Sequence, residues 1–308
     1  MTTSLVTIDH IQPIINMVTN AVSSDHTRRA YSRALTDFLT WYRESEQTQL
    51  NKAAVNAHVT WLRATGVSAS SINQRLSAIR KLALEAADNG LIEESTGQAI
   101  RRVEGVRQEG KKLGNWLNQE HAQALLNAPE LYDELGQPNL KGLRDRALLT
   151  TLIGCGLRRT EATNLTMEHI QQREGRWVIV DLSGKRNRIR SVPMPSWTKL
   201  AIDVWTVAAA IESGPIFLAM RKGGRILDHV MSDQGVWDVV KFYADQVQVN
   251  VGPHDLRRTF AKLARKGKAE LDQIQLSLGH ASVETTQKYV GEEQDLHSAP
   301  CDVLGLRL

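Results

Sequence analysis

Two imidazoles, a guanidinium and a phenol lie close together near the end of the chain, as His254, Arg257, His280 and Tyr289. His254 and Arg257 are three residues apart, so a helix would place both on one face. Gly279 is typical of a helix C-terminus, which would place His280 in the turn that follows. These four side chains could converge on a single phosphate group.

Apolar and capping residues predict the helices that would hold these groups. Leu256, Phe260 and Leu263 recur at helical spacing, which predicts a buried face beside the face that carries the first imidazole and the arginine. Ser282 is predicted to cap a short helix that carries Tyr289 about two turns further on. We therefore expect one helix to hold His254 and Arg257 and another helix to hold Tyr289.

Composition limits the classes of protein to which the chain can belong. With 308 residues, of which 42% are hydrophobic, the chain is long enough for two domains with cores of their own. The formal net charge is only +4, but lysine and arginine cluster at 185–190 and 257–268. Such clusters are typical of proteins that bind a polyanion, although a solvated basic face would give the same pattern.

Cysteine content and apolar runs indicate the cellular setting. Cys155 and Cys301 are the only cysteines, which excludes a disulfide framework and a cysteine-rich metal site. Residues 1–10 lack the basic start and apolar core of a signal peptide, and no apolar run reaches the roughly 20 residues of a membrane span. We expect a cytoplasmic protein with no membrane partner.

The first third of the chain is predicted to be helical. Apolar residues recur at helical spacing within 24–42, 53–64 and 70–83, and a shorter apolar patch at 11–18 could form a further helix. Basic residues that flank these faces could contact a polyanion or simply face solvent. They are Arg28, Arg29, Arg75, Arg80 and Lys81.

A break in the helical pattern predicts two domains. Between Glu104 and Gly114 the chain has three glycines and mixed charges but no apolar period, which is typical of a linker. We place a helical domain at 1–108, the linker at 109–115 and a second domain at 116–308.

An arginine in a tight turn opens the second group of reactive residues. A glycine on either side of Cys155 predicts the turn, and Cys155 itself is predicted to be a small core residue. Thr160 is predicted to cap the next helix. Arg158 would then lie just before that helix, where it could reach an anion or pair with Glu161.

A β-hairpin is predicted from 177 to 192, where valine, isoleucine and tryptophan are interrupted by the residues SGKRN. Lys185 would lie at or near its tip, and Pro193 would end the second strand. Helices are predicted in the rest of this domain at 118–128, 143–153, 197–211 and 232–245.

Five short motifs, in this order and spacing, resemble those of the tyrosine recombinase (phage integrase) family. They are GLRRTE around Arg158, SGKRN around Lys185, HDLRRTF with His254 and Arg257, LGH at His280, and TTQKY at Tyr289. The resemblance covers about 115–295, and the first domain is similar to the core-binding domain of the family. The layout resembles the two-domain Xer-like members.

Two positions depart from the pattern of the family without replacing any of the six motif residues. Arg258 stands where many members have a second histidine, and valine and glycine follow Tyr289 where threonine and histidine are frequent. The resemblance implies a mainly α fold of the α+β class. A helical core-binding domain would precede a mostly helical catalytic domain with a small antiparallel hairpin or sheet.

The resemblance implies that the six residues cleave DNA by in-line attack on a phosphodiester. Arg158 and Arg257 would hold the phosphate oxygens, because guanidinium stays protonated and presents a planar fork. Tyr289 would be the nucleophile, assisted by His254 or His280, and Lys185 would protonate the leaving 5′-oxygen. The arginines and the lysine already supply positive charge, so we expect no metal and no cofactor.

The implied partners are a double-stranded DNA recombination site and further copies of the chain. Arg186, Arg188 and Arg258 are expected to contact DNA together with the basic residues of the first domain. The family forms tetramers that exchange strands through a Holliday junction. An apolar tail, with Val303, Leu304, Leu306 and Leu308, is expected either to dock on a neighbouring protomer or to pack on its own domain.

Two other functions are compatible with these motifs. A type IB topoisomerase has similar catalytic residues but relaxes supercoils as a monomer, and a DNA-binding accessory protein could keep the fold without the chemistry. The helical first domain and the apolar tail favour a recombinase over the first, and the six intact residues favour it over the second. The sequence does not name the DNA site or the biological task.

Overall fold

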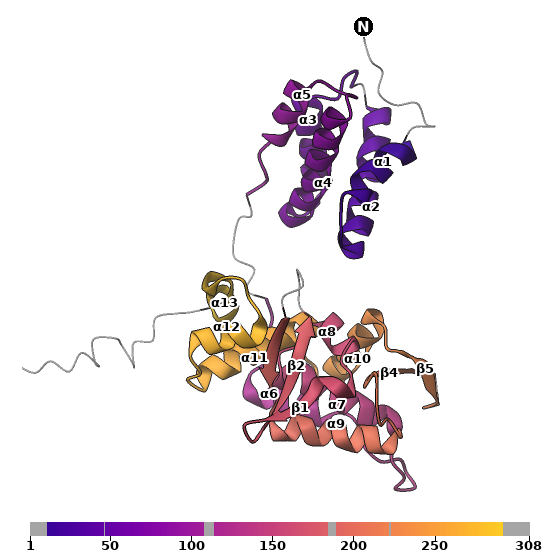
Figure 1. Ribbon diagram of the computed structural model, residues 1–308, viewed down its shortest axis with the longest axis vertical. Helices are drawn as coiled ribbons and strands as arrows, with labels where there is room; N and C mark the ends of the chain where they lie inside the picture. The colour runs from indigo at the N-terminus through magenta and orange to yellow at the C-terminus, as the bar shows by residue number, and fades with distance from the viewer. Residues whose placement is uncertain (1–10, 46, 108–113, 184–188, 222, 292–308) are drawn as a thin grey trace, which may run out of the picture. The chain divides into compact units, whose positions relative to one another are not determined.

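The computed structural model describes residues 11–45, 47–107, 114–183, 189–221 and 223–291. The chain divides into two compact units, Met1–Lys112 and Leu113–Leu308. Helices dominate both units, and two small antiparallel sheets lie in the second, which confirms the predicted mainly α fold. Figure 1 labels the helices α1 to α13 and the strands β1, β2, β4 and β5.

The regular secondary structure in the described part of the first unit is entirely helical. The helices are α1 (Ile11–Asn20), α2 (Asp25–Glu44), α3 (Lys52–Ala64), α4 (Ala69–Asp88) and α5 (Glu94–Arg101). The long helices begin at polar caps, since the side chains of Ser24, Asn51 and Ser68 each accept a backbone N–H of the first turn. Helix α5 was not predicted, because only Gly97 and Ile100 of its eight residues are buried.

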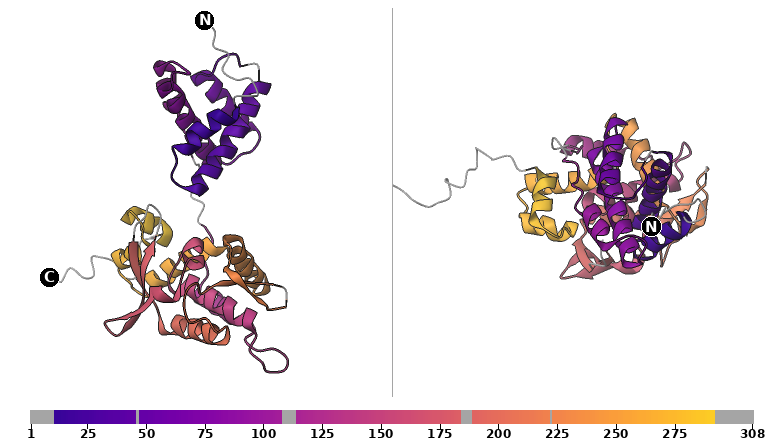
Figure 2. Two further views of the ribbon diagram at one scale, coloured as in Figure 1. Left: turned by 45° about the vertical axis from the view of Figure 1, so that its right-hand side comes forward. Right: turned by 90° about the horizontal axis from the view of Figure 1, so that it is seen from above.

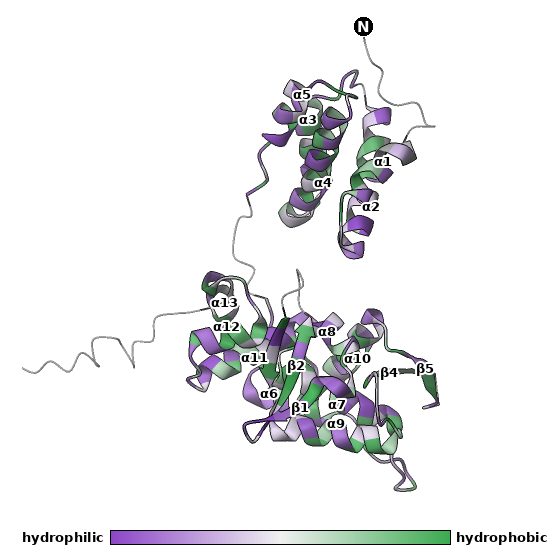
Figure 3. Cartoon of the chain, viewed as in Figure 1, coloured by the Kyte–Doolittle hydropathy of each residue, from purple (hydrophilic) through white to green (hydrophobic). Residues whose placement is uncertain are grey.

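The core of the first unit consists of the apolar faces that the sequence predicts. Leu35 and Phe38 of α2 and Leu76 and Ile79 of α4 are buried and belong to one cluster. Figure 3 shows that α4 carries hydrophobic and hydrophilic positions together, as expected for a helix with one buried side.

The second unit begins with helices and continues through short strands into a helical C-terminal part. Its elements are α6 (Gln119–Asn127), α7 (Leu140–Gly154), α8 (Arg159–Thr163), η2 (Met167–His169), β1 (Ile170–Arg173), β2 (Arg176–Ser183), β3 (Ile189–Pro193), α9 (Ser196–Ala208), β4 (Leu218–Met220), β5 (Ile226–Val230), α10 (Asp233–Gln246), α11 (Pro253–Lys266), α12 (Leu271–Leu278) and α13 (Val283–Val290).

Helix α7 is the centre of the second unit. It lies against α9 and α11, and all but four of its 15 residues are buried. Its charged residue Asp145 is fully buried, but its carboxylate accepts from Arg144 at 2.7 and 2.9 Å and from the Tyr243 hydroxyl at 3.1 Å. The buried charge is therefore paired and hydrogen-bonded, as a low-dielectric interior requires.

The strands form the predicted hairpin and add elements that the sequence did not reveal. Strands β2 and β3 pair antiparallel with Ile179 opposite Val192, and β1 pairs with the other edge of β2. Figures 1 and 2 draw these strands as neighbouring arrows. A separate hairpin joins β4 to β5. Strands β1 and β4, of four and three residues, are too short to show an alternating pattern.

Two predicted helix starts are wrong. Helix α7 begins three residues before Leu143, because the side chain of Asn139 caps it by accepting the Gly142 N–H at 3.2 Å. Thr160 does not cap α8, which begins at the preceding residue. Its N-cap is Arg158, whose backbone N–H donates to the Glu161 carboxylate at 2.8 Å.

Among the described residues, no helix is both long and apolar enough to cross a membrane. Cys155 is fully buried, which confirms that it is a core residue, and burial raises the pKa of its thiol to about 12.

The buried ring of His58 in α3 predicts that the stability of the first unit depends on pH. The ring is fully buried, with centroids 4.6 Å from Trp41 and 5.0 Å from Phe38, and neither nitrogen has a described hydrogen-bond partner. Burial, and next the charge of Arg75, lower the pKa of His58 from 6.5 to about 4. The unfolded chain therefore takes up this proton at a higher pH than the folded chain.

We predict that His58 causes no loss of stability above pH 6.5. As the pH falls from 6.5 towards 4, His58 should lower the free energy of unfolding progressively. Protonation of the unfolded chain alone should lower the free energy of unfolding by about 3 kcal/mol over this range. Denaturant titrations followed by tryptophan fluorescence would measure it. His58→Leu should remove this loss, whereas the exposed His26→Leu should keep it; equal pH dependence in both variants would contradict the prediction.

Gly156 closes the turn between α7 and α8, and the structure leaves no room for a side chain there. Its φ is +60°, and a Cβ atom would lie 2.7 Å from Cδ1 of Phe260. Gly175, in the turn between β1 and β2, also has a positive φ, but nothing lies within 4 Å of a Cβ built on it.

We predict that Gly156→Ala destabilises the protein more than Gly175→Ala. Both variants strain the backbone by roughly 1–2 kcal/mol, and overpacking against Phe260 should add about 1–3 kcal/mol to the first alone. Chemical denaturation of the two variants measures the difference directly. An equal loss in both would show that Phe260 gives way without cost.

Candidate active site

Five of the six predicted catalytic side chains come from elements that meet in the second unit. Helix α11 carries His254 and Arg257 one turn apart, His280 follows α12 in the turn, α13 carries Tyr289, and Arg158 caps α8. The figure shows α11, α12 and α13 as neighbours (Figure 1). Lys185 lies outside the described residues, as do Arg186 and Arg188.

The Tyr289 hydroxyl is hydrogen-bonded to Nε2 of His254. The rings of Tyr289 and His254 meet edge to face with centroids 5.4 Å apart, and the centroid of the His280 ring lies 4.7 Å from that of Tyr289. The guanidinium of Arg258 lies 5.3 Å from the centroid of the phenol ring. The phenol thus contacts two imidazoles and a cation.

The two imidazoles have different partners. Nδ1 of His280 lies 3.0 Å from the hydroxyl of Thr286, a fully buried residue of α13, so this contact fixes the orientation of the ring. His254 contacts the phenol directly. The sequence left open which histidine assists Tyr289, and the geometry favours His254.

Both histidines are neutral at pH 7. Burial, followed by the charges of Arg257 and Arg158, lowers the pKa of His280 to about 4. Burial also lowers the pKa of His254 from 6.5, and the charges of Arg257 and Arg258 lower it further. A neutral Nε2 on His254 can accept the proton of the phenol.

Arg257 is almost fully buried, and one of its donors has no partner. Nη1 donates to the Gly156 carbonyl at 2.6 Å and Nη2 donates to the Leu278 carbonyl, while Nε has no acceptor among the described residues. Burial, and next the charge of Arg158, lower the pKa of Arg257 to about 9, so it stays a cation at pH 7. An unpartnered buried donor is costly, so an added anionic acceptor would stabilise this site.

Glu161 is a buried anion between two arginines. Its Oε1 accepts Nη1 of Arg158 at 2.6 Å and Nη1 of Arg190 at 2.8 Å, and its Oε2 accepts Nη2 of Arg190 at 2.8 Å. Burial alone would raise the pKa of this carboxyl, but the bonds and charge of Arg190, then those of Arg158, lower it to about 2. Arg190 was not predicted as a site residue, although it belongs to the basic cluster 185–190.

Arg158 both pairs with Glu161 and remains available to an anion. Only its Nη1 donates to the carboxylate, and 28% of its side chain is exposed. The sequence left these two possibilities as alternatives; the structure shows the pairing with Glu161, and contact with an anion stays a prediction.

The predicted DNA-binding cations that the structure describes are at least partly exposed, and most contact the protein itself. Arg28 pairs with Asp25 at 2.9 Å, Arg75 with Asp37 at 3.0 Å, and Lys81 with Glu85 at 2.6 Å. Nη2 of Arg80 donates to the Val103 carbonyl, Arg29 is exposed, and Arg258 lies 3.9 Å from Asp255. Their contact with DNA stays a prediction.

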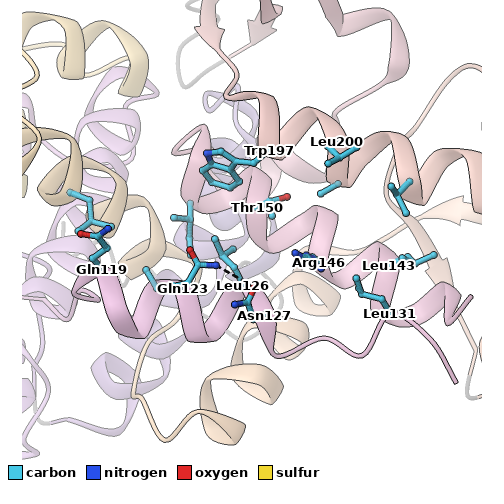
Figure 4. A pocket seen from close by; sticks show the side chains of 15 residues that line it. Gln119, Gln123, Leu126, Asn127, Leu131, Leu143, Arg146, Thr150, Trp197 and Leu200 are labelled. Carbon is cyan, nitrogen blue, oxygen red and sulfur yellow. Dashed lines mark hydrogen bonds between the residues drawn. The ribbon is translucent and has the colours of Figure 1, made fainter. Parts of the chain in front are cut away.

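A separate apolar groove of about 550 Å³ lies between α6, α7, α9 and α11 (Figure 4). Trp197 and Leu200 of α9 line it and are 45% and 64% exposed, which is unusual for such large apolar side chains. None of the described catalytic candidates lines this groove. Its other lining residues are Gln119, Ala122, Gln123, Leu126, Asn127, Leu131, Leu143, Arg146, Thr150, Ile153, Ala201, Val204 and Leu263.

Comparison with known proteins identifies both units of the chain. Residues 115–295 match the model of the phage integrase family, and residues 16–90 match the phage integrase N-terminal SAM-like domain. The tyrosine recombinase XerD of Pseudomonas aeruginosa is 30% identical over 95% of this chain and 97% of its own. The tyrosine recombinase XerC of Pelobacter propionicus is 30% identical over 89% and 87%.

Solved structures share the fold at low sequence identity. The XerH site-specific recombinase bound to a palindromic difH substrate superposes with a TM-score of 0.69 at 18% identity, over 94% of this chain and 87% of that chain. A lambda integrase dimer bound to a COC′ core site gives a TM-score of 0.67 at 16% identity, over 94% and 79%. With the fold, the family models and the relatives in agreement, the chain belongs to the phage integrase family of tyrosine recombinases.

Proposed function

We propose that this protein is a site-specific DNA recombinase that cleaves and rejoins DNA strands through a 3′-phosphotyrosyl intermediate. The observation that carries the proposal is the hydrogen bond between the Tyr289 hydroxyl and Nε2 of His254, a neutral imidazole at pH 7. A tyrosine hydroxyl has a pKa near 10, so it attacks efficiently at pH 7 only if a base removes its proton.

In the first step the Tyr289 oxygen attacks phosphorus while its proton moves to Nε2 of His254. Negative charge then builds on the non-bridging phosphate oxygens, where fixed cations stabilise the transition state most. Arg158 offers nitrogens that are not bonded to Glu161, and Arg257 offers the Nε donor that has no described acceptor. Both guanidinium groups are therefore suited to hold the scissile phosphate.

Cleavage breaks the bond from phosphorus to the 5′-oxygen, which leaves with a proton. We assign that proton to Lys185 on the basis of the family resemblance, since this lysine lies outside the described residues. The products are a 3′-phosphotyrosyl ester and a free 5′-hydroxyl. Because the ester keeps the energy of the phosphodiester, a second 5′-hydroxyl can reverse the attack and reseal the strand without a nucleotide cofactor.

The substrate proposed here is a double-stranded DNA recombination site. Structures of the XerH recombinase on its difH substrate and of lambda integrase on a core site support a duplex as substrate. By family resemblance, four copies of the chain would exchange strands through a Holliday junction. A cytoplasmic location and cofactor-free chemistry accompany this proposal.

No described feature favours the two other functions that the motifs allow. The N-terminal domain matches an integrase domain, and the relatives that cover nearly the whole chain are recombinases, which supports recombination over topoisomerase activity. The contact between Tyr289 and His254 supports an active enzyme over a silent accessory protein.

We predict that Tyr289→Phe abolishes the covalent protein–DNA adduct formed on a suicide substrate nicked next to the cleavage site. The phenylalanine lacks the attacking oxygen but keeps the ring contacts, so DNA affinity should stay within about 2-fold of the wild type. Denaturing gels measure the adduct, and gel shifts measure the affinity. Tyr132→Phe, at a tyrosine that is 64% exposed, is the matched control and should form the adduct normally. An adduct that survives in Tyr289→Phe would refute the nucleophile.

The apolar groove on α9 supports the proposed assembly through the C-terminal tail. The tail lies outside the described residues, and its sequence contributes Val303, Leu304, Leu306 and Leu308. The groove has room and apolar lining for several such side chains. We infer that the tail of one protomer docks in the groove of its neighbour.

We predict that Leu200→Asp and deletion of 299–308 each reduce multimeric complexes on DNA, because each removes one side of the same apolar contact. Single-protomer binding to a half-site should be unchanged. Val207→Asp is the control, since Val207 lies on α9 and is 81% exposed but does not line the groove. Native gels would resolve the complexes. Mixing the two defective proteins should restore one contact, whereas a tail that packs on its own domain would give no recovery.

A further inference from the structure

Arg190 connects three elements that carry catalytic candidates. It lies on β3, the second strand of the predicted hairpin. In the sequence, it lies five residues after Lys185. Its Nη1 and Nη2 donate to the Glu161 carboxylate of α8, each at 2.8 Å, and its Nε donates to the Ser277 carbonyl at the end of α12 at 2.9 Å. One side chain thus joins the hairpin to the turns that carry Arg158 and His280.

The geometry makes Arg190 unsuited to bind DNA itself. Each of its three side-chain nitrogens already has an acceptor, whereas Nε of the still more buried Arg257 has none among the described residues. Arg158 differs, because its Nη1 alone is bonded to Glu161 and 28% of its side chain is exposed. The protein therefore binds all the nitrogens of the Arg190 side chain, whereas Arg158 keeps nitrogens that could bind a ligand.

Arg190 determines how Glu161 is shared. The carboxylate side chain is 2% exposed, and Nη1 of Arg257 lies 3.8 Å from its Oε2. With Arg190 present, both carboxylate oxygens are occupied, so Arg158 makes only one side-chain bond to them. Without Arg190, the buried carboxylate would need other donors, and Arg158 and Arg257 are the nearest cations.

Gly279 leaves space for this arrangement. It ends α12 with a φ of +61°, and a Cβ atom there would lie 2.8 Å from Cδ of Arg190. The next residue is His280. The side chain of Arg190 therefore lies directly against the turn that places this histidine beside Tyr289.

We propose that Arg190 is a positioning residue for strand cleavage, which holds Glu161 so that the guanidinium of Arg158 stays directed at the scissile phosphate. Arg190 acts through Glu161 and does not touch the DNA. This inference rests on the proposed function, because strand cleavage is its readout.

The test compares Arg190→Met and Arg190→Lys with the wild type in single-turnover cleavage of the nicked suicide substrate. Displacement of Arg158 should lower the rate of adduct formation about 100-fold in Arg190→Met, and lysine, which cannot bind both carboxylate oxygens, should restore little of it. DNA affinity should stay within about 2-fold in both variants. Arg176→Met, an exposed arginine on β2 of the same sheet, is the matched control and should cleave normally.

Two further measurements separate positioning from a general loss of structure. If Arg190 acts through Glu161, its substitution should cost much less in an E161Q background than in the wild type. If it acts through Arg158 and not through the hairpin of Lys185, a substrate with a bridging 5′-sulfur should not rescue Arg190→Met. Sulfur leaves as a thiolate and needs no proton, so the same substrate should rescue Lys185→Ala.

Several results would contradict the positioning role of Arg190, and one would contradict the proposed function as well. Wild-type cleavage by Arg190→Met or Arg190→Lys, additive effects of Arg190→Met and E161Q, or rescue by the sulfur substrate would each overturn the positioning role. Should Arg190→Met not fold, Arg190→Lys, which keeps the charge and most of the volume, still gives the answer. An absence of adduct from the wild-type chain would overturn the proposed function and this inference with it.

Discussion

The candidate active site depends on one buried carboxylate among three guanidinium groups. Glu161 balances only part of the charge of Arg158, Arg190 and Arg257, so the site keeps an excess of positive charge in a poorly solvated place. The pKa of Arg257, lowered to about 9 by burial and by the charge of Arg158, reflects that excess. A DNA phosphate would supply the missing negative charge, and this gain would be largest where charge builds in the transition state.

Long-range contacts of the second unit bring these charges together from distant parts of the sequence. Arg257 donates to Gly156, which is 101 residues away in sequence, so α11 is tied to the turn between α7 and α8. That turn is possible because α7 is buried and because Gly156 has no side chain to meet Phe260. The pairing of Arg190 with Glu161 spans 29 residues and ties the sheet to the same place. A site built by such long-range contacts needs the whole second unit to be folded.

Elements whose pattern repeats along the chain could be predicted from the sequence, whereas long-range contacts could not. Helices α2 and α4 each repeat their apolar period over 20 residues, whereas α5 has too few buried positions to show one. Thr160 is a good cap by type, yet the Glu161 carboxylate caps α8 from inside the helix through the backbone of Arg158. Five described site residues were found from motifs. Arg190 and Thr286 were missed, because their partners define them and no local pattern does.

The same electrostatic arrangement accounts for the proposed clamp and for the proposed base. Cations that would hold a phosphate also disfavour a proton on a nearby imidazole, and burial acts in the same direction. His254 and His280 are therefore neutral at pH 7, although an isolated histidine titrates close to that pH. In the tautomer with its proton on Nδ1, neutral His254 presents an Nε2 lone pair to the Tyr289 hydroxyl, while Thr286 orients His280. Excess positive charge in a partly buried site would thus prepare both the proposed phosphate contacts and the proposed removal of the Tyr289 proton.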